Sequence, residues 1–191
     1  MADSCTDSCT QNTCGSLKSR STLINGSAFI GIVVVWVIID RLTKLYFDHT
    51  YALGQAPEHT YGLFQFKLVH NTGAAWGMFD QSTFMLGVVS LAVCIVIMVL
   101  IACFERIFEH PISLGEISSL ALVCAGGLGN ALDRFMYGYV VDFFDLTFMN
   151  FPVFNVADIG VTCGFILFMI ACVWQISHKE KRGDRKEETH E

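Results

Sequence analysis

The most chemically suggestive part of the sequence is the segment of residues 129–146, GNALDRFMYGYVVDFFDL, which places charged side chains in a mostly apolar chain. One of them, Asp142, interrupts a hydrophobic run where a purely structural element would carry another hydrophobic residue. A further acid, Asp158, follows near the start of an apolar stretch. Two carboxylates close together in a partly dry site cannot both ionise easily and therefore share a proton. The ionised one can deprotonate water while the protonated one polarises a carbonyl, so such a pair could hydrolyse a substrate.

The rest of the sequence offers no other familiar catalytic motif, since it contains no H-E-x-x-H, no G-x-S-x-G and no Walker loop. None of the six histidines lies in the middle of an apolar stretch, which argues against haem. Cys5, Cys9 and Cys14, in the polar start, fit no zinc or iron–sulfur spacing. We interpret the five cysteines in apolar stretches as packing residues: Cys94, Cys103, Cys124, Cys163 and Cys172. We therefore expect neither a metal nor another cofactor.

Several polar residues near the two acids have competing explanations. Asn130, Asp133 and Arg134 stand at i, i+3 and i+4, so they share one face of a helix. Asp133 and Arg134 could simply end that helix and pair with neighbours. Asn155 and Asp158 have the spacing of a helix capping box, which gives Asp158 a structural explanation beside the functional one. The residues alone leave both interpretations open at these positions.

Composition places these residues in a membrane protein. Of 191 residues, 53% are apolar and only 16% are charged, which is typical of membrane proteins and unusual for a soluble core. A bilayer-spanning helix needs about 20 mostly apolar residues. Four stretches meet this length and are predicted to form transmembrane helices: 28–47, 83–104, 112–134 and 156–176. We predict an all-α membrane protein with four transmembrane helices and no basic stripe for nucleic acid.

The chain divides into a membrane domain and two polar ends. We expect a polar cytoplasmic extension at 1–26, which lacks the apolar core of a cleavable signal, a membrane domain at 27–177, and a charged cytoplasmic tail at 178–191. With both ends in the cytoplasm, eight of the twelve Lys and Arg residues face inward and four face outward. The positive-inside rule favours this orientation.

The two segments that this topology places outside the membrane are predicted to form a small β-platform. In 48–82, Phe64, Phe66 and Leu68 alternate with other residues, as in a strand with one apolar face, while 139–148 is rich in β-branched and aromatic residues. Polar residues at the outer ends of three helices, and Asp142 between two of them, then converge at one depth. Ionisable groups at such a depth are costly and indicate function.

The sequence resembles the lipoprotein signal peptidases, also called signal peptidase II, of bacterial inner membranes. The resemblance covers nearly the whole membrane domain. It is highly specific because four blocks of residues match the family in their order and spacing. These blocks are D-R-L-T-K (40–44), N-T-G-A-A-W-G (71–77), G-G-L-G-N-A-L-D-R with G-Y-V-V-D-F (126–134 and 138–143), and F-N-V-A-D (154–158). The family usually has Phe where this chain has Trp76, and residues 1–26 lie outside the family pattern.

The resemblance implies a metal-independent aspartic endopeptidase that removes the signal peptide from diacylglyceryl-modified prolipoproteins just before the lipidated cysteine. Carried over by position, the catalytic pair is Asp142 and Asp158. The positions that bind substrate or support the pair are Asp40, Lys44, Asn71, Gly73, Asn130, Asp133, Arg134, Asn155 and Ala157. We expect a monomer in the inner membrane, with its site near the outer face, whose partners are the lipidated precursor and membrane lipid.

Two other functions fit parts of the pattern. A proton-coupled transporter also uses membrane acids, but its acids should lie near mid-span. A non-catalytic assembly factor would use the polar face to bind another helix, and it should tolerate asparagine at Asp142 and Asp158. Neither alternative accounts for all four blocks.

Overall fold

The computed structural model describes the backbone of residues 4–55, 59–74, 78–79, 82–108 and 110–187. Within these ranges it describes the side chains of residues 24–175 and of residue 177. Trp76 and the side chains of Cys5, Cys9 and Cys14 lie outside the described residues. The interpretations of these residues from the sequence therefore stay predictions.

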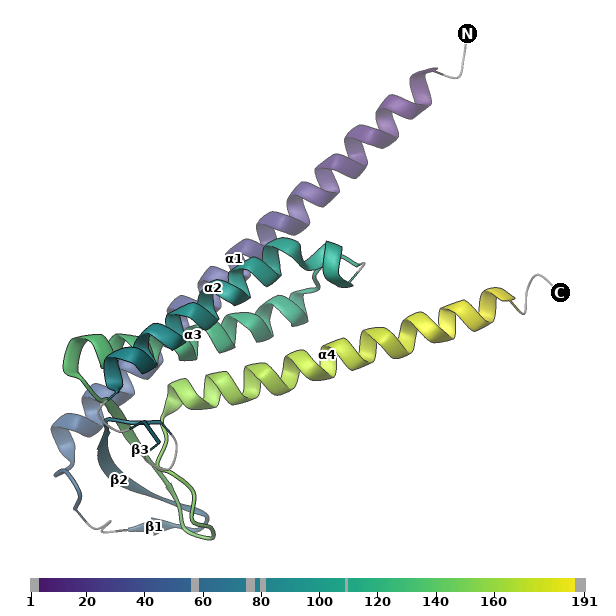
Figure 1. Ribbon diagram of the computed structural model, residues 1–191. Coiled ribbons are helices and arrows are strands. Elements are labelled where there is room, and N and C mark those ends of the chain that lie inside the picture. The colour runs from purple at the N-terminus through teal and green to yellow at the C-terminus, as the bar shows by residue number, and fades with distance from the viewer. Residues whose placement is uncertain (1–3, 56–58, 75–77, 80–81, 109, 188–191) are drawn as a thin grey trace.

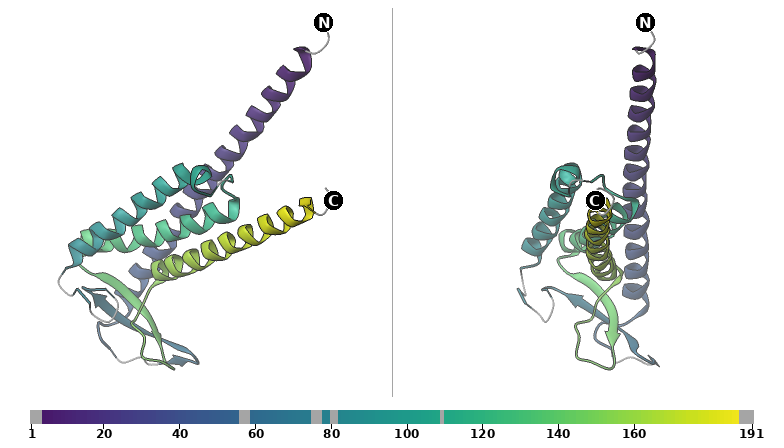
Figure 2. Two further views of the ribbon diagram at one scale, coloured as in Figure 1. Left: turned by 45° about the vertical axis from the view of Figure 1, so that its right-hand side comes forward. Right: turned by 90° about the vertical axis from the view of Figure 1, so that its right-hand side faces the viewer.

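Four helices form a bundle, and a small sheet lies at one end of it (Figure 1). The helices are α1 (Ser4–Thr50), α2 (Thr83–Phe108), α3 (Leu114–Tyr137) and α4 (Val156–Glu187). The start of α1 and the end of α4 both lie away from the sheet (Figure 2). We call the end of the bundle that lies next to the sheet the sheet end. The predicted architecture of four helices and a small sheet is confirmed.

Among the residues whose side chains the structure describes, three helices contain a segment long and apolar enough to cross a membrane: Thr83–Phe108, Leu114–Tyr137 and Val156–Gln175. The apolar stretch of α1 carries Asp40, Arg41 and Lys44 near its end. Both α1 and α4 are longer than the apolar stretches, because α1 continues through residue 26 and α4 through residue 177 without a break. The division of the chain at these residues stays a prediction.

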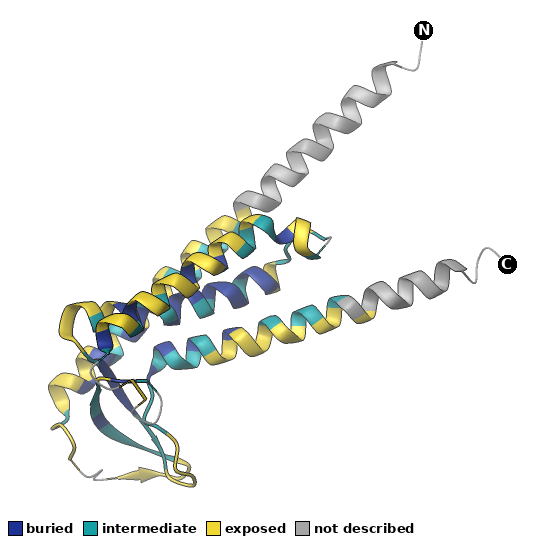
Figure 3. Ribbon diagram, in the orientation of Figure 1, coloured by how far each residue is buried: buried dark blue, intermediate teal, exposed yellow. Residues whose placement is uncertain are grey.

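The central helix is α3, which contacts each of the other three. In the most apolar stretch of α3, 61% of the residues are buried, compared with 17% in the corresponding stretches of α2 and α4 (Figure 3). Glycine makes this close packing possible. A Cβ at Gly126 would overlap the backbone oxygen of Ala157 on α4, and one at Gly129 would lie 2.6 Å from an oxygen of Asp40 on α1. These two positions bring α1 and α4 against the same part of α3.

Local signals fix both ends of α3. Ser113 is the N-cap and forms a reciprocal capping box with Glu116. At the other end Gly138 adopts a left-handed conformation with φ of 77°, and its N–H donates to the carbonyl of Arg134. The chain therefore leaves α3 in a defined direction and enters the third strand two residues later.

The sheet has three antiparallel strands in the order β1 (Thr60–Tyr61), β2 (Phe64–Asn71) and β3 (Val140–Leu146). The predicted strands in both segments are confirmed. A register shift between Phe66 and Val69 interrupts the β2–β3 ladder. Beyond it Val69 pairs with Asp142 and Asn71 with Val140, so the end of β2 lies beside the middle and start of β3.

An aromatic cluster joins the sheet to the end of α1. The rings of Phe47 on α1 and Phe143 on β3 stack with centroids 4.0 Å apart. Leu68 and Val141 complete this buried cluster. Because side chains alternate along a strand, Val141 and Phe143 share the face that packs in this cluster, and Asp142 lies on the opposite face of β3. Asp142 is nevertheless only 2% exposed, because Asn71 and Asn155 lie against its carboxylate on that face.

Candidate active site

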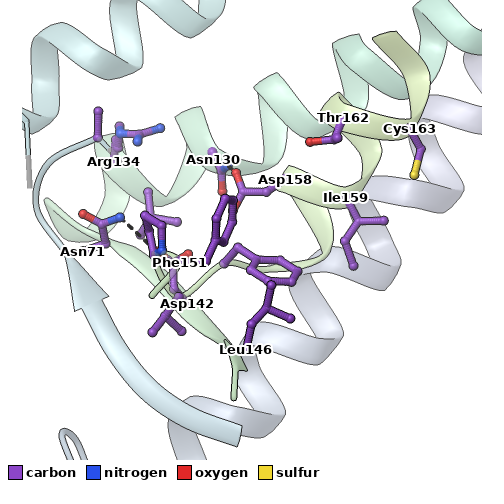
Figure 4. Close-up of a pocket in the computed structure, with 15 residues that line it drawn as sticks. Asn71, Asn130, Arg134, Asp142, Leu146, Phe151, Asp158, Ile159, Thr162 and Cys163 are labelled. Atoms are coloured by element: carbon purple, nitrogen blue, oxygen red, sulfur yellow. Dashed lines mark hydrogen bonds between the residues drawn. The ribbon is translucent and has the colours of Figure 1, made fainter. Parts of the chain in front are cut away.

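A cavity of about 420 Å³ lies at the sheet end, where β2, β3, α3 and α4 meet (Figure 4). Its polar lining consists of Asn71, Asn130, Arg134, Asp142 and Asp158. The other side is mostly apolar and includes Leu146, Phe151, Ile159, Thr162 and Cys163. The cavity therefore combines two carboxylates with a surface suited to an apolar ligand.

Asp142 is held by two amide side chains. One carboxylate oxygen, Oδ2, accepts a hydrogen bond of 2.9 Å from Nδ2 of Asn71 at the end of β2. The other, Oδ1, accepts one of 2.6 Å from Nδ2 of Asn155, which immediately precedes α4. The orientation of this carboxylate is thus set by two elements besides its own strand.

Asp158 lies in the first turn of α4, where it takes part in the predicted helix cap and also lines the cavity. The Asn155 N–H donates to Asp158 Oδ2 at 3.1 Å, and the Asp158 N–H donates to Asn155 Oδ1 at 3.0 Å. This is a reciprocal capping box. Asp158 Oδ1 also accepts 2.7 Å from Nδ2 of Asn130 on α3, and the residue lines the cavity. The cap itself therefore aims the carboxylate at the site.

The environment of Asp142 favours its protonated form. Burial, reinforced by the negative charge of Asp158, raises the pKa of Asp142 from its ordinary value of 3.8 to about 7. The hydrogen bonds from Asn71 and Asn155 and the charge of Lys44 act in the opposite direction. Two acids in one cavity, with the pKa of Asp142 raised to about 7, form a group that can hold a single proton at neutral pH.

A buried ionic layer lies next to the cavity. Lys44 on α1 is 2% exposed, and its Nζ lies 2.9 Å from carboxylate oxygens of both Asp40 and Asp133. The same ammonium donates at 2.9 Å to Oδ1 of Asn130, whose amide nitrogen binds Asp158. Lys44 therefore fixes the amide orientation of Asn130 by occupying its oxygen.

The two acids of this layer bind backbone groups next to the cavity acids. Asp40 accepts a 2.9 Å hydrogen bond from the N–H of Ala157. Asp133 accepts one of 3.4 Å from the N–H of Val141. Asp133 is fully buried, and its partners include residues far away in sequence, so its position at a helix end is not its only role.

Arg134 and Gly73 connect α3 to the segment that follows β2. Arg134 donates from Nη2 to the carbonyl of Gly73 at 3.4 Å. The N–H of Gly73 donates to Oδ1 of Asn71 at 3.0 Å. Arg134 thus lines the cavity with a positive charge and also supports the loop that orients Asn71.

All eleven residues proposed from the sequence lie in this one region. Five line the cavity, and Asn155, Ala157, Asp40, Lys44 and Asp133 form the buried layer around it, while Gly73 binds Arg134. The apolar lining could not be recognised from the sequence, because residues 151–154 lie in an irregular segment without periodicity. Cys163, which we interpreted as a packing residue, is exposed and lines the cavity. Within the described ranges, no three His, Cys, Asp or Glu side chains gather as a metal site.

The fold and site define a membrane protein with several spanning helices and a pair of buried carboxylates at one end of its bundle. Residues 32–174 match the family model of signal peptidase (SPase) II. A lipoprotein signal peptidase of Nostoc punctiforme is 36% identical over 155 residues, covering 81% of this chain and 90% of the relative. One of Clostridium acetobutylicum is 38% identical over 152 residues, covering 78% and 96%.

A solved structure of a bacterial membrane enzyme has the same fold, with a TM-score of 0.68 and 30% sequence identity over 79% of this chain and 90% of that one. A second bacterial membrane enzyme matches with a TM-score of 0.63 and 32% identity, covering 75% and 90%. The chain belongs to the signal peptidase II family.

Proposed function

We propose that this chain removes the signal peptide from diacylglyceryl-modified prolipoproteins just before the lipidated cysteine, with Asp142 and Asp158 as its catalytic pair. The observation that supports this most directly is that two buried aspartates from separate elements line one cavity in a member of the signal peptidase II family. The amide partners of each carboxylate support the same roles.

The mechanism follows from a shared proton. The ionised aspartate takes a proton from water as the water attacks the scissile carbonyl, while the protonated aspartate donates a hydrogen bond to the carbonyl oxygen. As the tetrahedral intermediate collapses, the C–N bond breaks and the aspartate that took the proton from water gives it to the leaving amine, which restores the pair with one shared proton. The positive charge of Arg134 at the cavity edge favours the negative charge that develops in this intermediate.

The site is proposed to lie near the outer face of the inner membrane, with both termini in the cytoplasm. The excess of Lys and Arg at the ends opposite the sheet supports this orientation. A substrate tethered by acyl chains, each buried methylene of which contributes about 0.8 kcal/mol of anchoring, must present its scissile bond near the bilayer surface. Ile159, Thr162 and Cys163, which line the cavity, lie within the membrane-spanning segment of α4 (Figure 4).

A monomer suffices for this chemistry, because one chain supplies both aspartates and all their hydrogen-bond partners described above. A transporter would need its acids near mid-span. Asp142 lies on a strand beyond the end of α3, and Asp158 lies in the first turn of α4. This placement favours the peptidase over a proton relay.

Cleavage of a synthetic precursor peptide by the detergent-purified protein tests the proposal. We expect cleavage at the bond preceding the cysteine when the cysteine carries a diacylglyceryl group, with at least about tenfold less product from the unlipidated peptide. Added chelator should leave the rate unchanged, because the two carboxylates activate water without a metal. A folded sample that cleaves neither peptide would contradict the proposed function, and loss of cleavage with chelator would contradict its metal independence.

The raised pKa of Asp142 gives an expected pH dependence. The pair needs one proton to polarise the carbonyl, and this proton is lost as the pH rises through the pKa of Asp142, which is about 7. The value of kcat for the lipidated peptide should therefore fall on the alkaline side. Initial rates measured from about pH 5 to about pH 9 check this. A rate that keeps rising to the alkaline end of that range would contradict the shared-proton mechanism.

A further inference from the structure

Arg41 is a charged residue that sequence analysis did not place among the supporting residues. It lies on α1, three residues before Lys44, and its side chain is 21% exposed. One guanidinium nitrogen, Nη1, donates to Asp133, and the other, Nη2, donates at 2.9 Å to the hydroxyl of Tyr137 on the same helix, α3. Its Cζ also lies 5.3 Å from the centroid of the Tyr137 ring.

The charges around Lys44 explain why a second cation is present. The Lys44 ammonium lies 2.9 Å from both Asp40 and Asp133, and both of these carboxylates are fully buried. One ammonium cannot neutralise two buried carboxylates, and an uncompensated buried charge is costly. With Arg41 bound to Asp133, the cluster of Asp40, Arg41, Lys44 and Asp133 has two positive and two negative charges.

Both acids of this cluster hold the backbone immediately before the proposed catalytic residues. Asp40 binds the N–H of Ala157, which precedes Asp158, and Asp133 binds the N–H of Val141, which precedes Asp142. An ionised carboxylate accepts such hydrogen bonds more strongly than a protonated one. Keeping both acids ionised therefore helps to fix the two segments that carry the pair.

Arg41 has a second route to the site through stacked rings. Tyr137 stacks on Tyr139 with centroids 5.9 Å apart, and Tyr139 stacks on His70 of β2 at 3.9 Å. His70 precedes Asn71, the partner of Asp142. The planar guanidinium binds Asp133 and Tyr137 at once, which a lysine ammonium would match only in charge.

We propose that Arg41 is a positioning residue, which balances the charge of the buried cluster so that Asp40 and Asp133 together hold the backbone next to the two catalytic aspartates. The inference rests on the proposed catalytic pair. Arg41 itself does not line the cavity, so it acts on the rate through Asp133 and not through contact with the substrate.

The test compares Arg41→Gln with Arg41→Lys in the cleavage assay on the lipidated peptide. Arg41→Gln should lower kcat by about 10-fold to 100-fold and change KM by less than about twofold, because displaced catalytic groups affect turnover more than binding. Arg41→Lys keeps the charge but loses the guanidinium contacts with Tyr137, so its kcat should lie between that of Arg41→Gln and that of the parent. Arg106→Gln, at an exposed position in the last turn of α2, is the matched control and should keep the parent rate.

A parent-like kcat in Arg41→Gln, or a kcat in Arg41→Lys no better than in Arg41→Gln, would overturn the proposal. If Arg41→Gln is too unstable for the assay, thermal unfolding decides: adding Asp133→Asn restores charge balance and should give a protein with a cooperative unfolding transition, at a higher temperature than any transition that the single variant shows. A double variant no more stable than the single one would also overturn it. Activity retained in Asp142→Asn and Asp158→Asn would instead refute the catalytic pair, so the two failures are distinguishable.

Discussion

Asp142→Asn and Asp158→Asn should each lose cleavage of the lipidated peptide by about 10²-fold to 10⁴-fold or more, because each removes a group that moves a proton in the reaction. Asparagine has nearly the same shape as aspartate but can neither accept the proton from water nor hold one for the carbonyl. Initial rates of product formation, with the amount of folded enzyme matched, measure the effect. Asp145→Asn is the control on the same strand, since Asp145 accepts a hydrogen bond from Gln65 and does not line the cavity.

The same substitution at Asp142 should leave the protein folded and change the pH dependence of its stability. The folded-state pKa of Asp142, about 7, is above the ordinary value of 3.8, so the protonated form is favoured by folding. The contribution of this group to stability is therefore fully present below about pH 4 and is lost as the pH rises through about 7. Asp142→Asn removes that loss, so its stability relative to the parent should improve between acid and alkaline pH. Unfolded Asp142→Asn protein, or activity near that of the parent, would contradict the catalytic assignment.

Much of the site could be predicted because its local geometry depends on the spacing of residues that lie a few positions apart in the sequence. The i, i+3, i+4 pattern places Asn130, Asp133 and Arg134 on one helix face, and the Asn155–Asp158 spacing predicts the capping box that forms. The alternation in β2 predicts a strand. Each of these depends only on residues close together in the chain.

The parts that could not be predicted depend on contacts between distant segments. Asp40 binds the N–H of Ala157 across 117 positions, and no periodicity in either segment indicates such a hydrogen bond. The contact between Arg41 and Asp133 likewise depends on how α1 packs against α3, where Gly129 lies against Asp40. The helices α1 and α4 also extend beyond the apolar stretches. Hydropathy indicates the length that can span the membrane, but it does not indicate where the backbone hydrogen bonds of a helix end.

Lys44→Met should destabilise the protein by roughly 3–5 kcal/mol, since it removes a buried cation and leaves two buried carboxylates facing only Arg41. Methionine has a similar length and keeps the packing of the apolar stem, so the loss reports on charge. Thermal unfolding in detergent should show a lower transition temperature than the parent. Lys67→Met, on half-buried β2 and outside this cluster, provides the same substitution as a control and should change the transition little.

The double variant Lys44→Met with Asp40→Asn separates the effect on stability from that on catalysis. It leaves Arg41 and Asp133 as a balanced pair, so part of the lost stability should return. Cleavage should not return with it, because Asn130 still lacks the ammonium that fixes its amide toward Asp158. Recovery of both would mean that Lys44 serves the fold alone. Recovery of stability without activity means that the contacts of Lys44 and Asp40 orient the catalytic pair in addition to stabilising the bundle.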